Sequence, residues 1–368
     1  MNTQIILAGL RARPVRTGVG VLAVTLEVLL ILILAGLTNG ALSDTGNRVA
    51  GVGGEIIFKP ADSSMALGLS SAIFPITMGE KIAQVEGIKA VAPVLAQMES
   101  TGGMGMVWGI DPPSFEAMSG GFTFLDGTMF SASDEAIVDD RIAGARKLTV
   151  GGQMKTLNRT FTITGIVQSG KGSRIYIPIH TAQEMVNRTD PAAASVFFIK
   201  LNDKSQTNRI IEELNEKFPD RDIIDADDWL SLMYASNAPF LSIVFDVILF
   251  IGVSVGVLVI FLSMYTTVTE RTREIGILRA MGASKGFIVV LVIQESLVLC
   301  IIGTVVGIGS SFLLVFLLRT FQPTLSILLT SGWVVRASIF ALLSGVIGSL
   351  YPAYKAASQD PIEALAYE

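Results

Sequence analysis

The sequence is poor in the residues from which most catalytic and metal sites are built. It has one cysteine, Cys300, and one histidine, His180, among 368 residues. A lone cysteine excludes an internal disulfide, and a lone histidine argues against a histidine-rich metal centre or a Ser/His/Asp triad. We therefore expect no catalytic residues, no metal site and no cofactor in this chain.

Charge is also scarce. Only 16% of the residues are charged and 51% are hydrophobic, whereas about 25% are charged in a typical soluble domain. This balance excludes a single soluble globular domain and a disordered chain, and the net charge of −5 argues against nucleic acid as a partner. The remaining class is a membrane protein with a large water-soluble part.

Four long apolar runs are present, each close to the ~20 residues that a helix needs to cross a bilayer. They predict transmembrane helices at residues 17–42, 240–267, 287–318 and 334–354. The first run is far longer than the apolar core of a secretory signal, which favours a retained helix over a cleaved one.

Basic residues set the expected orientation. They gather before the first helix, between the second and third, and after the fourth: Arg11, Arg13, Arg16, Arg271, Arg273, Arg279, Lys285 and Lys355. The positive-inside rule places these three segments, residues 1–16, 268–286 and 355–368, in the cytoplasm. Both termini are then cytoplasmic, residues 43–239 lie outside the membrane, and residues 319–333 form a short outer loop.

The external segment, residues 43–239, has a mixed α/β pattern. Turn residues and alternating apolar positions predict strands at 55–59, 90–97, 104–110, 136–138, 160–167, 174–178 and 196–201. Helical spacing predicts helices at 78–85, 139–147 and 206–218, and a helical stalk from residue 227 towards the second span. The expected fold class is therefore a four-helix α-helical membrane protein with an α/β (α+β) extracytoplasmic domain inserted between helices 1 and 2.

One segment of this domain, residues 165–173, nearly matches a phosphate-binding loop. The pattern requires Ser or Thr directly after the lysine, but Gly172 follows Lys171. A strand, rather than a helix, is predicted after the glycines. We interpret the segment as a hairpin turn and expect no nucleotide binding there.

Acidic residues inside apolar helices are costly and often functional. Glu27 is placed near mid-bilayer in the first span, and Asp246 near the outer end of the second. Both are candidates for lining a substrate cavity; the alternatives are a hydrogen bond to a neighbouring helix for Glu27 and snorkelling for Asp246. Glu295, in the inner part of the third span, is better explained by a structural role.

Two Gly-x-x-x-Gly motifs indicate close helix packing. They lie in the second span (Gly252 and Gly256) and in the third (Gly303 and Gly307). Small residues at this spacing let two helix backbones approach closely. The motif alone does not separate packing within one chain from packing between two copies.

The loop at 268–286 is the most informative stretch. Its apolar residues Ile275, Leu278 and Met281 recur every third position between charged residues, which predicts a short amphipathic helix. Gly282 suits the end of that helix, and Ser284 suits the N-cap of the next span.

This loop, read as Glu-Arg-Thr-Arg-Glu-Ile-Gly-Ile-Leu-Arg-Ala-Met-Gly-Ala-Ser-Lys from residue 270 to 285, closely resembles the cytoplasmic loop of FtsX/MacB-like ABC transporter permeases. The C-terminal stretch 351–365 resembles the ending of the same family. Residues 109–112, 134–138 and 160–168 resemble its extracytoplasmic domain. The order of one span, a large domain and three spans also fits.

The resemblance implies a permease subunit without its own nucleotide-binding domain, working with a dimer of cytoplasmic ABC ATPases and a second permease copy or paralogue. The loop would be the coupling helix, with the residues Arg271, Arg273, Glu274, Ile275, Gly276, Leu278, Arg279 and Gly282. The expected function is ATP-driven movement of the external domain and export or extraction of a hydrophobic or amphiphilic substrate.

The alternative is a complex that transports nothing and regulates an extracytoplasmic partner such as a cell-wall hydrolase. An extracytoplasmic adaptor or hydrolase and membrane lipid are the other partners that the resemblance suggests. The expected location is the bacterial inner membrane.

Overall fold

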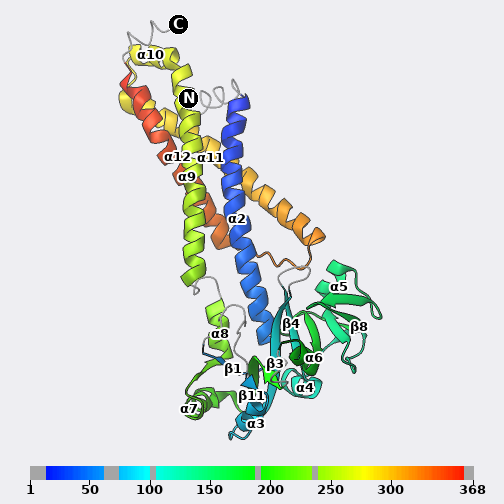
Figure 1. Ribbon diagram of the computed structural model, residues 1–368. Helices are drawn as coiled ribbons and strands as arrows, with labels where there is room; N and C mark the ends of the chain where they lie inside the picture. The colour runs from blue at the N-terminus through cyan, green and yellow to red at the C-terminus, as the bar shows by residue number, and fades with distance from the viewer. Residues whose placement is uncertain (1–13, 62–73, 100–104, 187–191, 234–238, 360–368) are drawn as a thin grey trace. The chain divides into compact units, whose positions relative to one another are not determined.

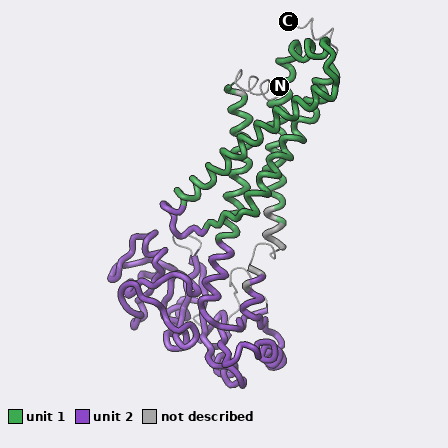
Figure 2. Tube along the Cα trace, turned by 180° about the vertical axis from the view of Figure 1, so that it is seen from behind, with its two compact units in different colours: residues 1–40, 239–318, 327–368 green, residues 41–238, 319–326 purple. Residues whose placement is uncertain are grey.

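The computed structural model describes residues 14–61, 74–99, 105–186, 192–233 and 239–359. The chain divides into two compact units (Figure 2). Unit 1 comprises residues 1–40, 239–318 and 327–368, and unit 2 comprises residues 41–238 and 319–326. The basic residues Arg11 and Arg13, used above for orientation, lie outside the described residues.

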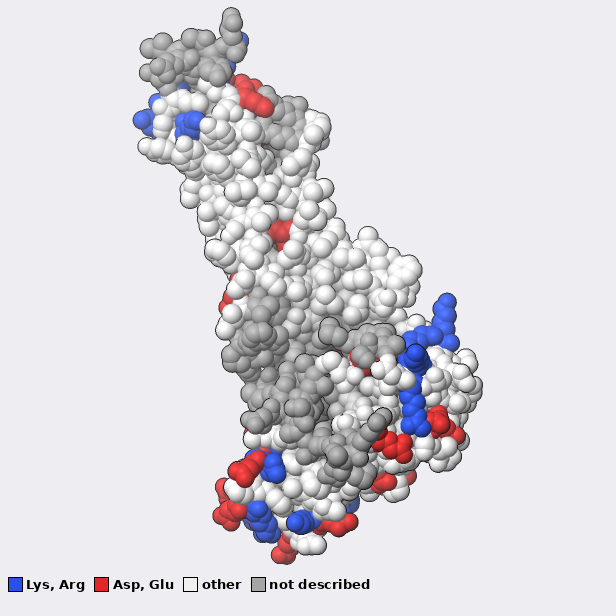
Figure 3. Space-filling view, in the orientation of Figure 1, with Lys and Arg blue, Asp and Glu red and all other residues white. Residues whose placement is uncertain are grey.

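Unit 1 is a helical bundle (Figure 1). Its helices are α2 (Pro14–Ala50, whose last ten residues belong to unit 2), α9 (Pro239–Glu270), α10 (Thr272–Ala280), α11 (Lys285–Phe321) and α12 (Ser331–Ser358). Among the described residues, four helices are long and apolar enough to cross a membrane, namely α2, α9, α11 and α12. On the face drawn in Figure 3, blue side chains of this unit lie near the end that carries α10, whereas red ones lie both there and along the bundle. The chain is thus a multi-pass α-helical membrane protein, as predicted.

The Gly-x-x-x-Gly motif of α11 packs against α2 of the same chain. A Cβ atom at Gly303 would lie 2.6 Å from Val24 Cβ, and one at Gly307 would lie 2.9 Å from Val28 Cβ. Thr25 Oγ1 also donates a hydrogen bond to the Gly303 carbonyl at 3.2 Å. Only glycine allows this approach of two backbones, so this motif serves packing within the chain.

The motif of α9 is divided between two environments. Gly256 is buried and faces the Glu27 carboxyl group on α2, whereas a Cβ atom at Gly252 would meet nothing within 4 Å. On α12, Gly348 lies against the backbone of α9 at Val257. Small residues therefore set the helix spacing on both sides of α9.

Unit 2 contains the α/β domain. Its strands are β1 (Ile56–Pro60), β2 (Phe74–Pro75), β3 (Ile88–Glu99), β4 (Gly105–Ile110), β5 (Phe124–Gly127), β6 (Glu135–Asp139), β7 (Gln153–Thr156), β8 (Arg159–Val167), β9 (Ile175–Pro178), β10 (Ala193–Ala194), β11 (Val196–Leu201) and β12 (Arg221–Asp225). Its helices are α3 (Thr77–Ala83), α4 (Pro112–Ser119), α5 (Asp140–Arg146), α6 (Ile179–Val186), the 3-10 turn η1 (Lys204–Gln206), α7 (Thr207–Lys217) and α8 (Ala226–Met233).

Ten strands form one mixed sheet in the order β12-β1-β11-β3-β4-β9-β6-β8-β5, with β7 paired to β8, and β2 pairs separately with β10. The predicted hairpin at residues 165–173 is wrong. Strand β6 lies between β8 and β9, parallel to β8 and antiparallel to β9. The glycine-rich segment is therefore a connection that passes over the end of β6, and β8 does not pair with β9.

The elements of unit 2 form for local reasons that the sequence signals. In α4, Asp111 is the N-cap, and its Oδ2 accepts a hydrogen bond from Ser114 N at 3.1 Å. Pro112 begins that helix and Gly120, with φ +73°, ends it. In α7, the apolar positions Ile210 and Leu214 are fully buried against the sheet, as helical spacing requires.

Candidate functional site

The predicted coupling helix is α10, which lies between α9 and α11 in unit 1. Ile275 and Gly276 are buried, and Ile275 belongs to the hydrophobic core of the bundle. Arg273 and Glu274 are exposed. Ile277 and Met281 are also exposed, by 44% and 72%.

The helix therefore has a bundle side and a free side. Leu278 packs partly on the bundle core, so the apolar residues that remain open on the free side are Ile277 and Met281. The sequence placed Ile275, Leu278 and Met281 together. The structure brings Ile275 and Leu278 together on the bundle and turns Met281 outward.

Arg271 fixes the beginning of α10. Its Nε donates to Glu274 Oε2 at 2.9 Å, and its Nη1 lies 3.3 Å from Glu295 Oε2 on α11. Glu295 is only 7% exposed, so its carboxylate depends on this guanidinium for charge balance. The ion pair joins α10 to the span that follows it, in line with the structural role expected for Glu295.

The end of α10 is equally well defined. Gly282 has φ +98°, its N–H bonds to the Arg279 carbonyl, and the Ala283 N–H bonds to the Leu278 carbonyl, each at 3.0 Å. This is the Schellman pattern, for which glycine is favoured. Ser284 Oγ then accepts a hydrogen bond from Phe287 N at 3.2 Å, so the helix stop and the following N-cap are both confirmed.

Glu27 lies inside the bundle and is 5% exposed. Its Oε1 accepts a hydrogen bond from Ser344 Oγ on α12 at 2.8 Å. Its Oε2 is buried with no hydrogen-bond partner among the described residues, and it lies over Gly256 of α9. The carboxyl group is therefore packed between three helices.

Asp246 has a different environment. It lies in the second turn of α9 and is exposed. Among the described residues, no hydrogen bond or ion pair joins it to Glu27. The structure does not bring the two cavity candidates together, and their contact with a substrate stays a prediction.

Lys171, the lysine of the phosphate-loop-like segment, has a structural task. Its Nζ donates to the carbonyl oxygens of Ser119, at 2.8 Å, and of Gly121. These groups lie at the C-terminal end of α4, where a cation is favoured. Burial lowers the pKa of Lys171, and the nearby Lys200 lowers it further.

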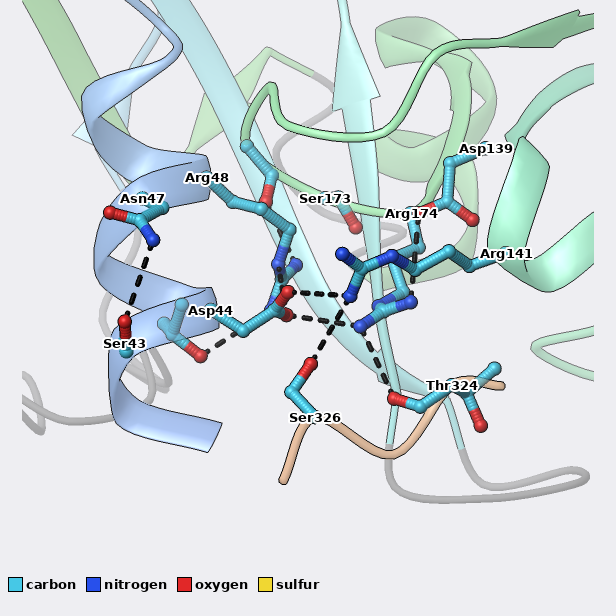
Figure 4. Close-up of polar contacts among 12 residues, drawn as sticks. Ser43, Asp44, Asn47, Arg48, Asp139, Arg141, Ser173, Arg174, Thr324 and Ser326 are labelled. Atoms are coloured by element: carbon cyan, nitrogen blue, oxygen red, sulfur yellow. Dashed lines mark hydrogen bonds and ion pairs between the residues drawn. The ribbon is translucent and has the colours of Figure 1, made fainter. Parts of the chain in front are cut away.

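A cluster that the sequence did not suggest lies in unit 2 around the carboxylate of Asp44 (Figure 4). Asp44 Oδ2 lies 3.0 Å from Arg48 Nε and 3.0 Å from Arg174 Nη2. Asp44 Oδ1 lies 2.9 Å from Arg141 Nη1. We call these four residues the Asp44 cluster. They come from α2, from α5 and from the residue directly before β9, so only the fold brings them together.

Two of these arginines also contact the loop at residues 322–330, which follows α11. Arg141 Nη1 donates to Ser326 Oγ at 3.2 Å. Arg174 Nη2 donates to the Thr324 carbonyl at 3.2 Å (Figure 4). The loop therefore shares its guanidinium partners with Asp44.

Two family models match this chain. The MacB-like periplasmic core domain matches residues 17–217, and the FtsX-like permease C-terminal region matches residues 247–361. The first of these covers more than half of the chain.

Among curated proteins, the chain is 25% identical to the ABC transporter permease YknZ of Bacillus subtilis strain 168, over 100% of this chain and 99% of that protein. It is also 25% identical to the macrolide export ATP-binding/permease protein MacB of Bdellovibrio bacteriovorus, over 98% of this chain but only 60% of that protein. Among solved structures, the extracellular domain of YknZ from Gram-positive bacteria aligns with 47% of this chain and 99% of that domain, at 16% identity and a TM-score of 0.35.

Proposed function

Because the chain belongs to the family of ABC transporter permeases with a MacB-like periplasmic core domain and an FtsX-like C-terminal region, we propose that α10 is the element through which it binds a separate cytoplasmic ATPase. Permeases of this type work with such an ATPase as ABC transporters. The observation that carries the proposal is the free side of α10, where Ile277 and Met281 are exposed beside Arg273.

The geometry of α10 suits a docking element. A short helix transmits force only if its own position is fixed, and α10 is held at its start by the Arg271–Glu295 ion pair and along its length by Ile275. Exposed apolar side chains next to an arginine are typical anchors of protein interfaces. ATP-driven closure of two ATPase subunits would then move α9 and α11 through this helix.

The assembly that we propose contains two ATPase subunits and two permeases, the second permease being another copy or a paralogue, in the inner membrane of a bacterium with both termini in the cytoplasm. The task that we propose is export or extraction of a hydrophobic or amphiphilic substrate. Support comes from the relatives, since MacB of Bdellovibrio bacteriovorus is named for macrolide export.

The docking test compares charge substitutions on the free side of α10 with a matched control. We expect Met281→Glu and Ile277→Glu each to lower co-purification of the ATPase at least about tenfold, because a buried unpaired charge costs several kcal/mol at an interface. Phe321→Glu, at another exposed apolar position, should leave binding unchanged. Equal binding by all three variants would refute the docking assignment.

Orientation has its own test. In a Cys300→Ala background, an impermeant thiol reagent applied to intact spheroplasts should label Ala145→Cys and not Ser284→Cys, both exposed positions. The opposite pattern would invert the proposed topology.

A second experiment separates export from regulation of an external partner. Inverted membrane vesicles should take up substrate if the permease is an exporter, and should take up none if it only regulates a partner.

A further inference from the structure

We propose that Asp44 is a positioning residue that fixes the end of α2 and the outer loop at residues 322–326 to the extracytoplasmic domain, so that they move with it as one body. This inference rests on the proposed function, in which ATP-driven helix movement reaches that domain. It adds the contact through which the movement passes.

The first argument is charge. Three guanidinium groups, from Arg48, Arg141 and Arg174, converge on one carboxylate at 2.9 to 3.0 Å. The side chain of Asp44 is only 15% exposed, so water screens these charges poorly. Without the carboxylate, three like charges would face one another in a partly buried space. The carboxylate is therefore the group that holds the cluster together.

The second argument concerns the outer loop. The Ser326 hydroxyl and the Thr324 carbonyl of this loop accept hydrogen bonds from Arg141 and Arg174, the same guanidinium groups that Asp44 orients. Ser326 also bonds to the Asp44 side chain. The loop follows α11 directly, so one carboxylate fixes two chain segments that lead from membrane helices.

The third argument is the backbone contact next to the cluster. Gly172 N donates to the Arg48 carbonyl at 2.6 Å, and Arg48 Nη1 donates to the Gly172 carbonyl at 2.9 Å. Gly172 has φ +64°, and a Cβ atom there would collide with the Trp108 ring. This reciprocal pair fixes the last turn of α2 on the domain. The two hydrogen bonds between Arg48 and Gly172, together with the ion pairs of the Asp44 cluster, therefore hold the end of α2 rigidly on the domain.

These contacts allow α2 to pass its movement to the domain. Helix α2 is continuous from Pro14 to Ala50 and contains both Glu27 and Asp44. A shift of α2 in the bundle is passed along the helix to Asp44, and from there to α5 and β9 through Arg141 and Arg174. A neutral residue in place of Asp44 would leave the helix and the Arg48–Gly172 pair intact, and would loosen the contacts of the helix end with Arg141 and Arg174.

The experiment uses the full permease in nanodiscs with its ATPase. Spin labels on Val305→Cys and Ala145→Cys, both exposed and placed in units 1 and 2 respectively, report the distance between the units in a Cys300→Ala background. ATP with vanadate should shift this distance in the otherwise unmodified permease. A second pair, on Ala41→Cys of α2 and Ala145→Cys, both exposed and both in unit 2, should give one narrow distance in both states, because the Asp44 cluster keeps the end of α2 on the domain.

Asp44→Asn is the decisive variant. We expect it to keep ATPase binding and basal hydrolysis, to reduce the nucleotide-dependent Val305–Ala145 shift below that of the control, and to broaden the Ala41–Ala145 distance. Asp222→Asn is the matched control, since it removes another ion pair of the same unit, that with Lys59 at 2.6 Å, and should change neither distance.

The outcomes separate the two proposals. A shift in Asp44→Asn as large as in the control would overturn this inference and leave the proposed function standing. Absence of any shift before Asp44 is changed would instead overturn the proposed function. If Asp44→Asn does not fold, Arg141→Met decides, because it removes the guanidinium that bonds to both Asp44 and Ser326. An unreduced shift together with an unbroadened Ala41–Ala145 distance in this variant would also overturn the inference.

Discussion

A change at Gly256 tests how tightly Glu27 is held in the bundle. A Cβ atom at position 256 would collide with the Glu27 carboxyl group, far inside the distance that real Cβ contacts show. Gly256→Ala must therefore displace either the carboxyl group or the helix. Displacing the carboxyl group breaks the 2.8 Å hydrogen bond from Ser344.

The expected cost follows from two contributions. Overpacking by one methyl group in a tight core costs about 1–3 kcal/mol, and loss of a hydrogen bond to a charged or strongly polar group adds about 1.5–3 kcal/mol. A gain in helix propensity of up to ~1 kcal/mol opposes them. We expect a net loss of about 2–4 kcal/mol, visible as a clear drop in the thermal midpoint of the purified permease in detergent.

Two variants make the result specific. Gly252→Ala lies one turn away on the same helix, with nothing within 4 Å of its new Cβ, and should be neutral or stabilising. Combining Gly256→Ala with Glu27→Ala removes the clash, so the second substitution should offset most of the loss caused by the first. If the losses of stability in the double variant are instead additive, the two positions are not coupled. Glu27 would then be free to move away from position 256, as it would be in a water-filled cavity.

Three further outcomes follow from the same structure. Glu295→Gln should weaken the tie to Arg271 and lower ATPase stimulation more than ATPase binding, whereas equal effects on both would contradict a positioning role. Burial raises the pKa of Asp139 to about 6, against partly compensating hydrogen bonding from Ile142 N and attraction by Arg174. The carboxyl group of Asp139 therefore keeps its proton in the folded state up to about pH 6, whereas it loses the proton near pH 4 in the unfolded state. As the pH rises from 4 to 6, the free energy of unfolding falls by up to about 3 kcal/mol. Asp139→Asn keeps the helix cap and removes the titrating group, so the difference in thermal midpoint between this variant and the unmodified protein should change between pH 4 and pH 6. A difference that stays constant over this pH range would refute the argument. Lys171→Met should lower the stability of the domain by about 1–3 kcal/mol, since it strips a charged donor from the end of α4, and should leave nucleotide binding by the permease–ATPase complex unchanged.

Much of the fold could be predicted because its signals are local. Apolar length identified four helices, Ser284 identified a helix start, and Gly282 identified a helix end. The strands with alternating apolar residues, such as β8, were also found. These features depend on neighbours within a few residues, which a sequence pattern contains.

The remaining features depend on long-range pairing. Strand β12 was missed because three of its five residues are charged, a composition tolerated at a sheet edge. The placement of β6 between β8 and β9 cannot be deduced from turn residues. The Asp44 cluster was missed for the same reason, since its members are separated by up to 130 residues.

The candidate coupling helix shows a third kind of error. Apolar residues at every third position suggested one face, but a helix turns by about 100° per residue, so positions six apart differ by about 240°. Ile275 and Met281 therefore lie on different sides, one buried and one exposed. The helix itself was correctly predicted, and the division of its residues between bundle and free side required the structure.

The two ends of the α/β domain meet. The Ala226 N–H donates to the Glu55 carbonyl at 2.9 Å, and β1, the first strand, pairs with β12, the last, from Ile56 opposite Asp225 to Pro60 opposite Arg221. A domain whose entry and exit are neighbours can be inserted into a host chain, enlarged or exchanged without moving the host's helices. The permease thus has the topology of a cassette, in which the α/β module can diversify for different tasks while the membrane bundle and α10 stay the same.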